Sequence, residues 1–133
     1  MEFDIPDIPV HQIIEAGQAD WLNSTFSDFK PFPNKLVKGE RCSSFFAEIE
    51  GKPAGWGYLV YHADLAYLAG MFTSPEFRQM GAATAILHRM HQHALEKGVR
   101  QIILSPSFMA WNFYNKRGYQ TIAHYSTFLP VKK

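Results

Sequence analysis

The run from Met71 to Thr84 holds residues whose types and spacing suit the binding of a phosphate group. Arg78 supplies a permanent positive charge, and Gly81 is followed by two alanines where a helix is expected to begin. The first turn of a helix has backbone N–H groups without partners inside the helix, and its dipole favours an anion. Small side chains let a diphosphate come close to those amides. The same residues also fit a plain strand–loop–helix connection, so both interpretations stay open on spacing alone.

This run matches neither of two common phosphate-binding patterns. It has no GxxxxGK[ST] loop of the kind that holds nucleoside triphosphates, and no GxGxxG dinucleotide turn. The chain carries 13 Lys and Arg against 12 Asp and Glu, a formal charge of +1. No basic excess therefore attracts nucleic acid or an anionic membrane, and neither is an expected partner. Any anion is expected to be held by a local arrangement of backbone and side-chain groups.

The compartment is predicted from the cysteine content and the first residues. Cys42 is the one cysteine, so the chain cannot form an internal disulfide, which fits a reducing compartment. The start is acidic and lacks the basic and apolar parts of a signal peptide. The most apolar region, residues 54–72, is interrupted by His62 and Asp64, which does not fit a membrane span. A cytoplasmic protein is expected.

The elements that must position the run from Met71 to Thr84 follow from hydrophobic periodicity and turn residues. Apolar residues at helical spacing predict a long helix over 81–97, and residues 65–73 are apolar on both faces, which favours a central strand. The other expected elements are strands over 10–14, 44–50, 55–61, 101–104 (of the buried type) and 119–129, helices over 19–26 and 109–116, and turns at 50–53 and 62–64. This order is a mixed α/β plan, and 133 residues fit one domain over residues 1–133.

Two motifs resemble the signatures of the GNAT N-acetyltransferase superfamily. The first is Pro75-Glu76-Phe77-Arg78 continued by Gln79-Met80-Gly81-Ala82-Ala83, and the second is Asn112-Phe113-Tyr114-Asn115-Lys116-Arg117-Gly118-Tyr119. The resemblance covers residues 65–129, about half of the chain. It implies a single-domain GNAT-like α/β fold, with a mixed, mostly antiparallel β-sheet flanked by helices and with splayed central strands.

The resemblance implies a site for acetyl-CoA as cosubstrate and no metal. In the family, the strand end that matches residues 71–73 pairs with the pantetheine arm, and the amides that match residues 79–84 hold the diphosphate. Ser107 stands where many members have an asparagine and is carried as a CoA contact. The residues thus assigned to acetyl-CoA are Met71, Phe72, Thr73, Arg78, Gln79, Met80, Gly81, Ala82, Ala83, Thr84 and Ser107. A Gly81→Glu change is expected to weaken CoA binding because it would place a carboxylate among the phosphates.

Tyr114 is the residue to which the resemblance assigns catalysis, because the family's matching tyrosine commonly protonates the departing thiolate. An amine would attack the thioester, and N–H groups near residues 71–73 would stabilise the oxyanion. A phenol of pKa ~10 can protonate a thiolate whose conjugate acid has a pKa of ~8.5. Without the resemblance, a core tyrosine packed on its aromatic neighbours is the favoured interpretation. The predicted function is acetyl-CoA-dependent N-acetyltransfer to a primary amine by direct attack on the thioester. The alternative is a non-catalytic acyl-CoA-binding or protein-interaction domain.

Other residues leave their roles open. No general base is identifiable, and the candidates, each of which also fits a structural role, are Glu48, His62, Asp64 and His124. Gly70 fits either a bulge that splays its strand or close packing. The aromatics that either line an acceptor pocket or fill the core are Trp21, Phe26, Phe29, Phe32, Trp56 and Tyr58. His88, His91 and His93 share one helix without cysteine or acidic ligands at suitable spacing, so no metal is predicted.

The expected partners follow from the acceptor chemistry and from the end of the chain. The acceptor is expected to be a small molecule or a peptide that carries an amine. The residues after Gly118 fit one strand better than two, so the strand over 119–129 would form an apolar sheet edge. Such edges are usually covered or paired, which predicts a homodimer whose partner subunit could complete the acceptor pocket.

Overall fold

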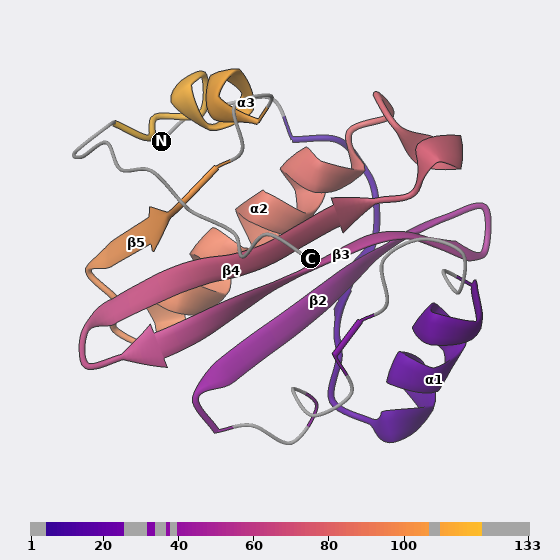
Figure 1. Cartoon of the computed structure of the whole chain (residues 1–133), viewed down its shortest axis with the longest axis horizontal. Helices are drawn as coiled ribbons and strands as arrows, with labels where there is room; N and C mark the ends of the chain where they lie inside the picture. Colours follow the sequence, from indigo (N-terminus) through magenta and orange to yellow (C-terminus); the bar gives the residue numbers. More distant parts are fainter. Residues whose placement is uncertain (1–4, 26–31, 34–36, 38–39, 107–109, 121–133) are drawn as a thin grey trace, which may run out of the picture. The chain divides into compact units, whose positions relative to one another are not determined.

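The structure is a computed structural model that describes residues 5–25, 32–33, 37, 40–106 and 110–120 (Figure 1). The chain divides into two compact units, a larger one over Ile5–Ser105 and a smaller one that includes Pro106–Lys133. The larger unit holds a five-stranded sheet and two α-helices. None of the helices in the described part of the chain combines the length and the apolar character that crossing a membrane requires.

The sheet has the strand order β1-β2-β3-β4-β5, so each strand pairs with the next one along the chain. Its strands are β1 (Val10–Gln12), β2 (Cys42–Ile49), β3 (Lys52–His62), β4 (Leu65–Thr73) and β5 (Gln101–Leu104). The first four strands are antiparallel, whereas β5 runs parallel to β4. A parallel pair needs a crossover connection, which helix α2 (Ala82–Glu96) supplies. The mixed, mostly antiparallel α/β sheet predicted from the sequence is confirmed.

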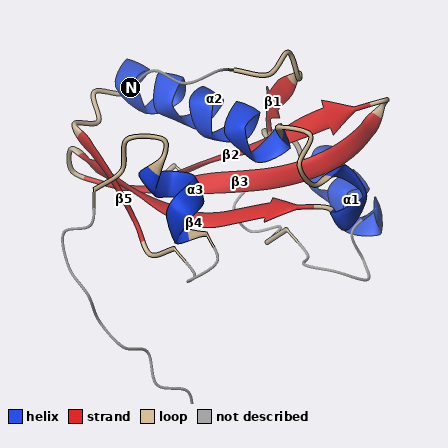
Figure 2. Ribbon diagram, turned by 90° about the horizontal axis from the view of Figure 1, so that it is seen from above, coloured by secondary structure: helices blue, strands red, loops and turns tan. Residues whose placement is uncertain are grey.

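Helices α1 (Ala16–Thr25) and α2 cover opposite faces of the sheet. Neighbouring residues of a strand point to opposite faces. On β2, the Phe45 ring meets His93 of α2 at 5.3 Å between centroids, and the Phe46 ring meets Trp21 of α1 at 5.5 Å. Figure 2 shows α2 lying along one face of the strands. The largest fully buried side chains of α2 are Ile86, Leu87 and Met90.

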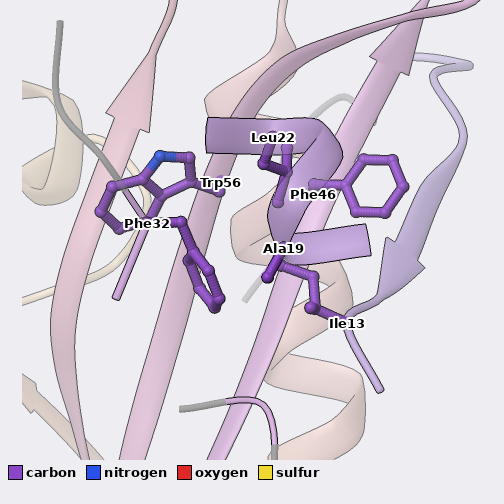
Figure 3. Close-up of a cluster of buried hydrophobic side chains, with 6 residues drawn as sticks. All are labelled: Ile13, Ala19, Leu22, Phe32, Phe46 and Trp56. Atoms are coloured by element: carbon purple, nitrogen blue, oxygen red, sulfur yellow. The ribbon is translucent and has the colours of Figure 1, made fainter. Parts of the chain in front are cut away.

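A cluster of buried side chains joins α1 to its face of the sheet (Figure 3). Its members are Ile13, Ala19, Leu22, Phe32, Phe46 and Trp56. Phe32 and Trp56 meet edge to face at 5.6 Å, so both fill the core and do not line an acceptor pocket. Trp21 is 38% exposed, and Tyr58 packs partly buried against the cluster. The two aromatics that lie outside the described residues are Phe26 and Phe29.

A two-residue turn joins β2 to β3. It consists of Glu50 and Gly51, whose φ angles are 54° and 75°. Both values are left-handed, as a type I′ hairpin turn requires, and that turn suits the twist of the flanking strands. The turn is shorter than the predicted range 50–53, because Lys52 and Pro53 already belong to β3 and pair with β2.

Helix α1 begins at Ala16, ahead of the predicted start at residue 19. The side-chain oxygen of Gln18 accepts the backbone N–H of Ile14 at 2.8 Å and that of Glu15 at 3.0 Å. These bonds satisfy amides just ahead of the helix. Because the cap depends on a folded-back side chain, apolar periodicity does not reveal it.

Strand β5 has the predicted bounds, but its predicted burial is wrong. Its side chains alternate between exposed and half-buried, and Ile103 is 38% exposed. In the described part of the chain β5 pairs with β4 alone, so β4 is second from that edge of the sheet and not central. Of the expected last strand, Tyr119 and Gln120 are not in a strand, and residues 121–129 lie outside the described residues.

Candidate functional site

Strand β4 is paired on both sides over its first half and on one side over its second half. Its register with β5 ends at Leu68↔Leu104, whereas its register with β3 continues to Thr73↔Gly55. In the described part of the chain, residues 71–73 therefore border β3 alone, which confirms the splayed strand. Such an open edge presents N–H and C=O groups that can bind an extended chain through β-type hydrogen bonds.

A β-bulge lies where β4 separates from β5. Tyr58 of β3 pairs with Gly70, and the next residue of β3 pairs with Leu68, so Ala69 is the extra residue. A bulge bends its strand and increases the local twist. A Cβ atom on Gly70 would lie 2.5 Å from Tyr58 Cε1 and 3.0 Å from Trp56 Cζ3. Gly70 therefore serves both expected purposes, since it adjoins the bulge and packs closely under two aromatic rings.

The loop after β4 is attached to the sheet by its backbone. The Ser74 N–H donates to the Ala54 carbonyl at 2.9 Å, and the Ser74 carbonyl accepts the Phe77 N–H at 2.9 Å. These bonds surround a short 3-10 helix, η2 (Pro75–Phe77), whose Phe77 side chain is buried. Residues 78–80 are exposed. The chain therefore enters α2 from a solvent-facing turn with a fixed start.

The turn that begins α2 has the backbone conformation of an anion site. Gly81 is the N-cap residue, with φ 94° and ψ 7°, and as a glycine it has no side chain with which to cap the helix. A left-handed residue followed by a right-handed helical one directs successive N–H groups toward a common point, a concavity known as a nest. The first helical bond runs from the Ala85 N–H to the Gly81 carbonyl at 3.0 Å. The amides of the first turn thus lie ahead of the helical ladder, where the helix dipole also favours an anion.

Arg78 is the charged side chain next to this turn. It is exposed and forms no ion pair or hydrogen bond with another residue of the described part of the chain. The side chains of Ala82 and Thr84 are buried, so these two residues can approach a ligand only through their backbone. Gln79 has a left-handed φ of 65°, which is uncommon for a residue other than glycine. Arg78 is available to add a charged hydrogen bond to an anion held by the turn.

Pro6 contacts Gly81, although the two residues lie far apart in the sequence. A Cβ atom on Gly81 would lie 2.5 Å from Pro6 Cγ. Any side chain at residue 81 would therefore begin against Pro6. The weaker CoA binding expected of Gly81→Glu stays a prediction. No pattern in the sequence indicated this contact.

Tyr114 lies in the smaller unit, on the short helix α3 (Trp111–Asn115). Its side chain is 7% exposed, and its ring meets those of Phe113 and Tyr119 edge to face at 5.0 Å and 5.5 Å. Burial raises the pKa of the Tyr114 hydroxyl above its ordinary value of 10. The hydroxyl therefore keeps its proton at neutral pH, as a proton donor must, while the ring packs as a core residue does.

Two of the base candidates lie at the wrong end of β4. His62 ends β3 and Asp64 belongs to the turn before β4. Because a strand rises ~3.3 Å per residue, Asp64 lies roughly 23 Å along β4 from Met71. The expectation that His62 and Asp64 could reach the open strand end is therefore wrong. The Asp64 carboxylate instead lies 3.8 Å from Arg100.

Glu48 lies at the end of the sheet where β4 ends. Its strand neighbour Ala47 pairs with Gly55, and Gly55 pairs with Thr73. Two strand spacings of ~4.8 Å therefore separate Ala47 from Thr73. The Glu48 carboxylate is 3.9 Å from His11 Nε2. Glu48 thus remains the base candidate best placed among those described. The two assigned or candidate residues outside the described part are Ser107 and His124.

The histidines of α2 have separate surroundings. His93 Nε2 lies 3.0 Å from Ser43 Oγ, which also accepts the Tyr61 hydroxyl at 2.9 Å. Burial, together with the charge of the nearby His88, lowers the pKa of His91 to about 4. Within the described part of the chain, no group of three His, Cys, Asp or Glu residues could hold a metal ion.

Known proteins share this fold. A sequence model of the acetyltransferase (GNAT) family matches residues 10–119. The aminoglycoside N-acetyltransferase AAC(6')-Iy in complex with CoA superposes with a TM-score of 0.74 at 16% identity, over 93% of this chain and 100% of that chain. An acetyltransferase from Trypanosoma brucei gives 0.72 at 14% identity, over 93% and 100%. A ribosomal-protein-alanine N-acetyltransferase from Brucella melitensis biovar Abortus 2308 gives 0.67 at 12% identity, over 94% and 99%.

These structural likenesses show the fold and nothing beyond it, because proteins of one fold can have different activities. No curated protein sequence matches the chain significantly. The family match extends from β1 to the residue after Gly118 and includes both motifs, the open edge of β4 and the turn before α2. The chain therefore belongs to the acetyltransferase (GNAT) family.

Proposed function

We propose that this protein transfers the acetyl group of acetyl-CoA to a primary amine. The observation that carries the proposal is that the open edge of β4 leads directly into the anion-binding turn of α2. An extended arm that ends in a diphosphate would meet strand-type hydrogen-bonding groups along residues 71–73 and converging N–H groups at residues 79–84. CoA has this shape, with a pantetheine arm joined to a diphosphate.

Several features of the turn fit the diphosphate of CoA. The left-handed Gly81 shapes the nest, and as a glycine at the N-cap it carries no side chain that would bond to the first amides of the helix. Ala83 is small and half-buried, so it leaves the backbone approachable. Arg78 is exposed beside them and can add a charged hydrogen bond. The backbone conformation at Gly81, the small side chain of Ala83 and the charge of Arg78 therefore all favour the binding of an anion at this turn.

The open edge of β4 would also assist the reaction. Acetyl-CoA supplies a thioester carbonyl that an amine can attack and a thiolate that can leave. Backbone N–H groups along residues 71–73 would donate to the carbonyl oxygen as it gains negative charge. Pairing with β3 already holds these groups in position, so little reorganisation is needed when the charge develops.

Tyr114 is the proposed proton donor to the leaving sulfur, through its Oη atom. The support is its place in the second family motif and its burial, which keeps the hydroxyl protonated. Because burial raises the pKa of Tyr114 above 10, transfer to a thiolate whose conjugate acid has a pKa of ~8.5 is uphill. The donor must therefore act on the developing thiolate within a hydrogen bond, as general acids do in a transition state.

The acceptor class follows from chemistry and from the breadth of the structural neighbours. The nucleophile must be a neutral amine that reaches the thioester. Neighbours of this fold include aminoglycoside and ribosomal-protein-alanine N-acetyltransferases. The proposal therefore covers amines of small molecules and of peptides.

A direct assay tests the proposal. The purified full chain is titrated with CoA by calorimetry, and thiol release from acetyl-CoA is then measured with spermidine, an aminoglycoside and a peptide with a free N-terminal alanine. We expect CoA to bind and at least one amine to raise thiol release above the acceptor-free rate. Mass spectrometry should show one added acetyl group, and the N-acetylated form of the same acceptor serves as control.

The outcomes separate the two candidate functions. CoA binding without transfer to any amine would favour the non-catalytic acyl-CoA-binding alternative. A folded chain that does not bind CoA would contradict the proposal itself. The homodimer also stays a prediction, and light scattering at high concentration tests it by the mass it returns.

A further inference from the structure

We infer that Pro6 is a positioning residue, which holds Gly81 in the left-handed conformation that shapes the anion-binding turn before α2. The inference rests on the proposed function, because the turn matters only if it binds the diphosphate of CoA. It adds a residue outside both family motifs to the machinery of that site.

Pro6 occupies the space beside Gly81 in which any other residue would place its Cβ atom. That atom would lie 2.5 Å from Pro6 Cγ, 3.0 Å from Pro6 Cβ and 3.7 Å from Ile8 Cδ1. Real Cβ atoms essentially never approach another heavy atom within 3.0 Å. The pyrrolidine ring can therefore lie this close to the turn only because residue 81 is a glycine.

Pro6 is itself held in place by a segment anchored to the sheet. Its carbonyl accepts the Ile8 N–H at 2.9 Å, and the Pro9 carbonyl accepts the Glu48 N–H at 2.9 Å. Strand β1 then pairs with β2 from Val10 onward. Figure 1 shows this first part of the chain passing beside the start of α2. Because proline has a fixed φ and a rigid ring, Pro6 presents a firm surface to Gly81.

A firm surface matters here because glycine is the most flexible residue. Gly81 can adopt both negative and positive φ values, but only the left-handed one, φ 94°, gives the observed turn. A ring packed against its Cα restricts the alternatives before any ligand arrives. Restricting them lowers the ordering cost of binding, which is how preorganisation increases affinity. The expected consequence is an effect on CoA affinity and none on the chemical step.

The test compares two proline substitutions of the full chain. Pro6→Ala removes the ring atoms that contact Gly81, whereas Pro9→Ala removes the same atoms at an exposed position three residues along. Affinities are measured for CoA and for pantetheine, which has the same arm without the diphosphate. We expect Pro6→Ala to raise the Kd for CoA roughly five- to tenfold, within the range for directly contacting groups, and to leave the Kd for pantetheine unchanged. Pro9→Ala should change neither, and Pro6→Val, which keeps bulk at residue 6, should stay within about twofold of the wild type.

A double-mutant cycle checks that Pro6 acts through Gly81. Gly81→Ala places a Cβ against Pro6 Cγ, so its loss of CoA affinity should be smaller in the Pro6→Ala background, where that atom is gone. Thermal unfolding confirms that each variant is folded. Unchanged CoA affinity in Pro6→Ala, an equal loss for pantetheine, or strict additivity in the cycle would overturn the inference. A wild-type chain that fails to bind CoA would overturn the proposed function instead.

Discussion

The backbone N–H of Tyr119 donates a hydrogen bond to the carbonyl of Tyr114 at 3.2 Å, and the two rings meet edge to face at 5.5 Å. Gly118, with φ 92°, lies between them and donates to the Asn115 carbonyl at 3.3 Å. This is the Schellman motif, in which a left-handed glycine ends a helix and the residue after it packs back on the last turn. The glycine and aromatic of the second family motif therefore cap α3 and hold the ring of Tyr114 in place.

Tyr114→Phe tests the proposed proton donor. The substitution keeps the buried ring and removes only the hydroxyl. We expect kcat to fall about 10²-fold with CoA affinity nearly unchanged, because the lost interaction belongs to the transition state. Steady-state kinetics with the best amine of the panel, together with CoA titration, measure both quantities. Tyr119→Phe removes the neighbouring hydroxyl and should leave kcat near the wild-type value.

The pH profile adds an independent check on Tyr114. Because burial raises the pKa of its hydroxyl above 10, the protonated form persists throughout the range below pH 10. Loss of the proton from Tyr114 should therefore cause no fall in kcat below that pH. Full kcat in Tyr114→Phe at every pH would assign the acid to water or another group.

Arg78→Ala tests the charge beside the turn. Arg78 is exposed and has no ion-pair partner in the described part of the chain, so its removal should not lower stability. We expect the Kd for CoA to rise about tenfold at low salt, which corresponds to about 1.4 kcal/mol, and less at high salt because ions screen exposed charges. Calorimetry at two salt concentrations measures this, with Arg100→Ala, beside Asp64, as the matched control. Equal affinities for Arg78→Ala and Arg100→Ala would remove Arg78 from the site.

Gly70→Ala tests the packing beside the bulge. The added Cβ would lie 2.5 Å from Tyr58 Cε1 and 3.0 Å from Trp56 Cζ3, so the aromatic rings would have to move. We expect the free energy of unfolding to fall by about 1–3 kcal/mol, as for overpacked cores. Gly17→Ala, in helix α1 with nothing within 4 Å of the added atom, should instead raise it by about 0.5–1 kcal/mol. Urea unfolding of both variants measures the difference, and a neutral Gly70→Ala would show that the rings yield freely.

Acid should weaken the fold through His91. Burial, with a further contribution from His88, lowers the pKa of His91 to about 4 in the folded chain, whereas the unfolded value is ~6.5. As the pH falls below about 6.5 the unfolded chain takes up the proton first, so the free energy of unfolding decreases until about pH 4. Because His91 is only half-buried, the loss should be on the order of 1–2 kcal/mol. Denaturant unfolding between pH 7 and 4 measures how the free energy of unfolding changes with pH. This change should be smaller in His91→Gln than in the wild type, and an equal change would contradict the role of His91.

The sequence by itself determined the elements that local patterns specify. The bounds of β4 and β5 and the extent of α2 followed from apolar runs, helical periodicity and the stop at Gly98, whose left-handed φ of 78° ends the helix. The position of Gly81 at the start of α2 was equally readable, because small residues before a helical pattern act through the nearest backbone. Local signals suffice where the physical cause lies within a few residues.

Only the tertiary structure decided the contacts between segments distant in the sequence. The point at which β4 separates from β5 depends on the strand register and on the extra residue Ala69. Neither can be predicted from residue type. The sequence favoured a core position for Trp56 but left an acceptor pocket open, and the packing of Phe32 and α1 against Trp56 places it in the core. The contact of Pro6 with Gly81 likewise comes from the path of β1 past α2. Burial and register are properties of the assembled sheet, because each depends on which surfaces meet and not on the propensity of any one segment.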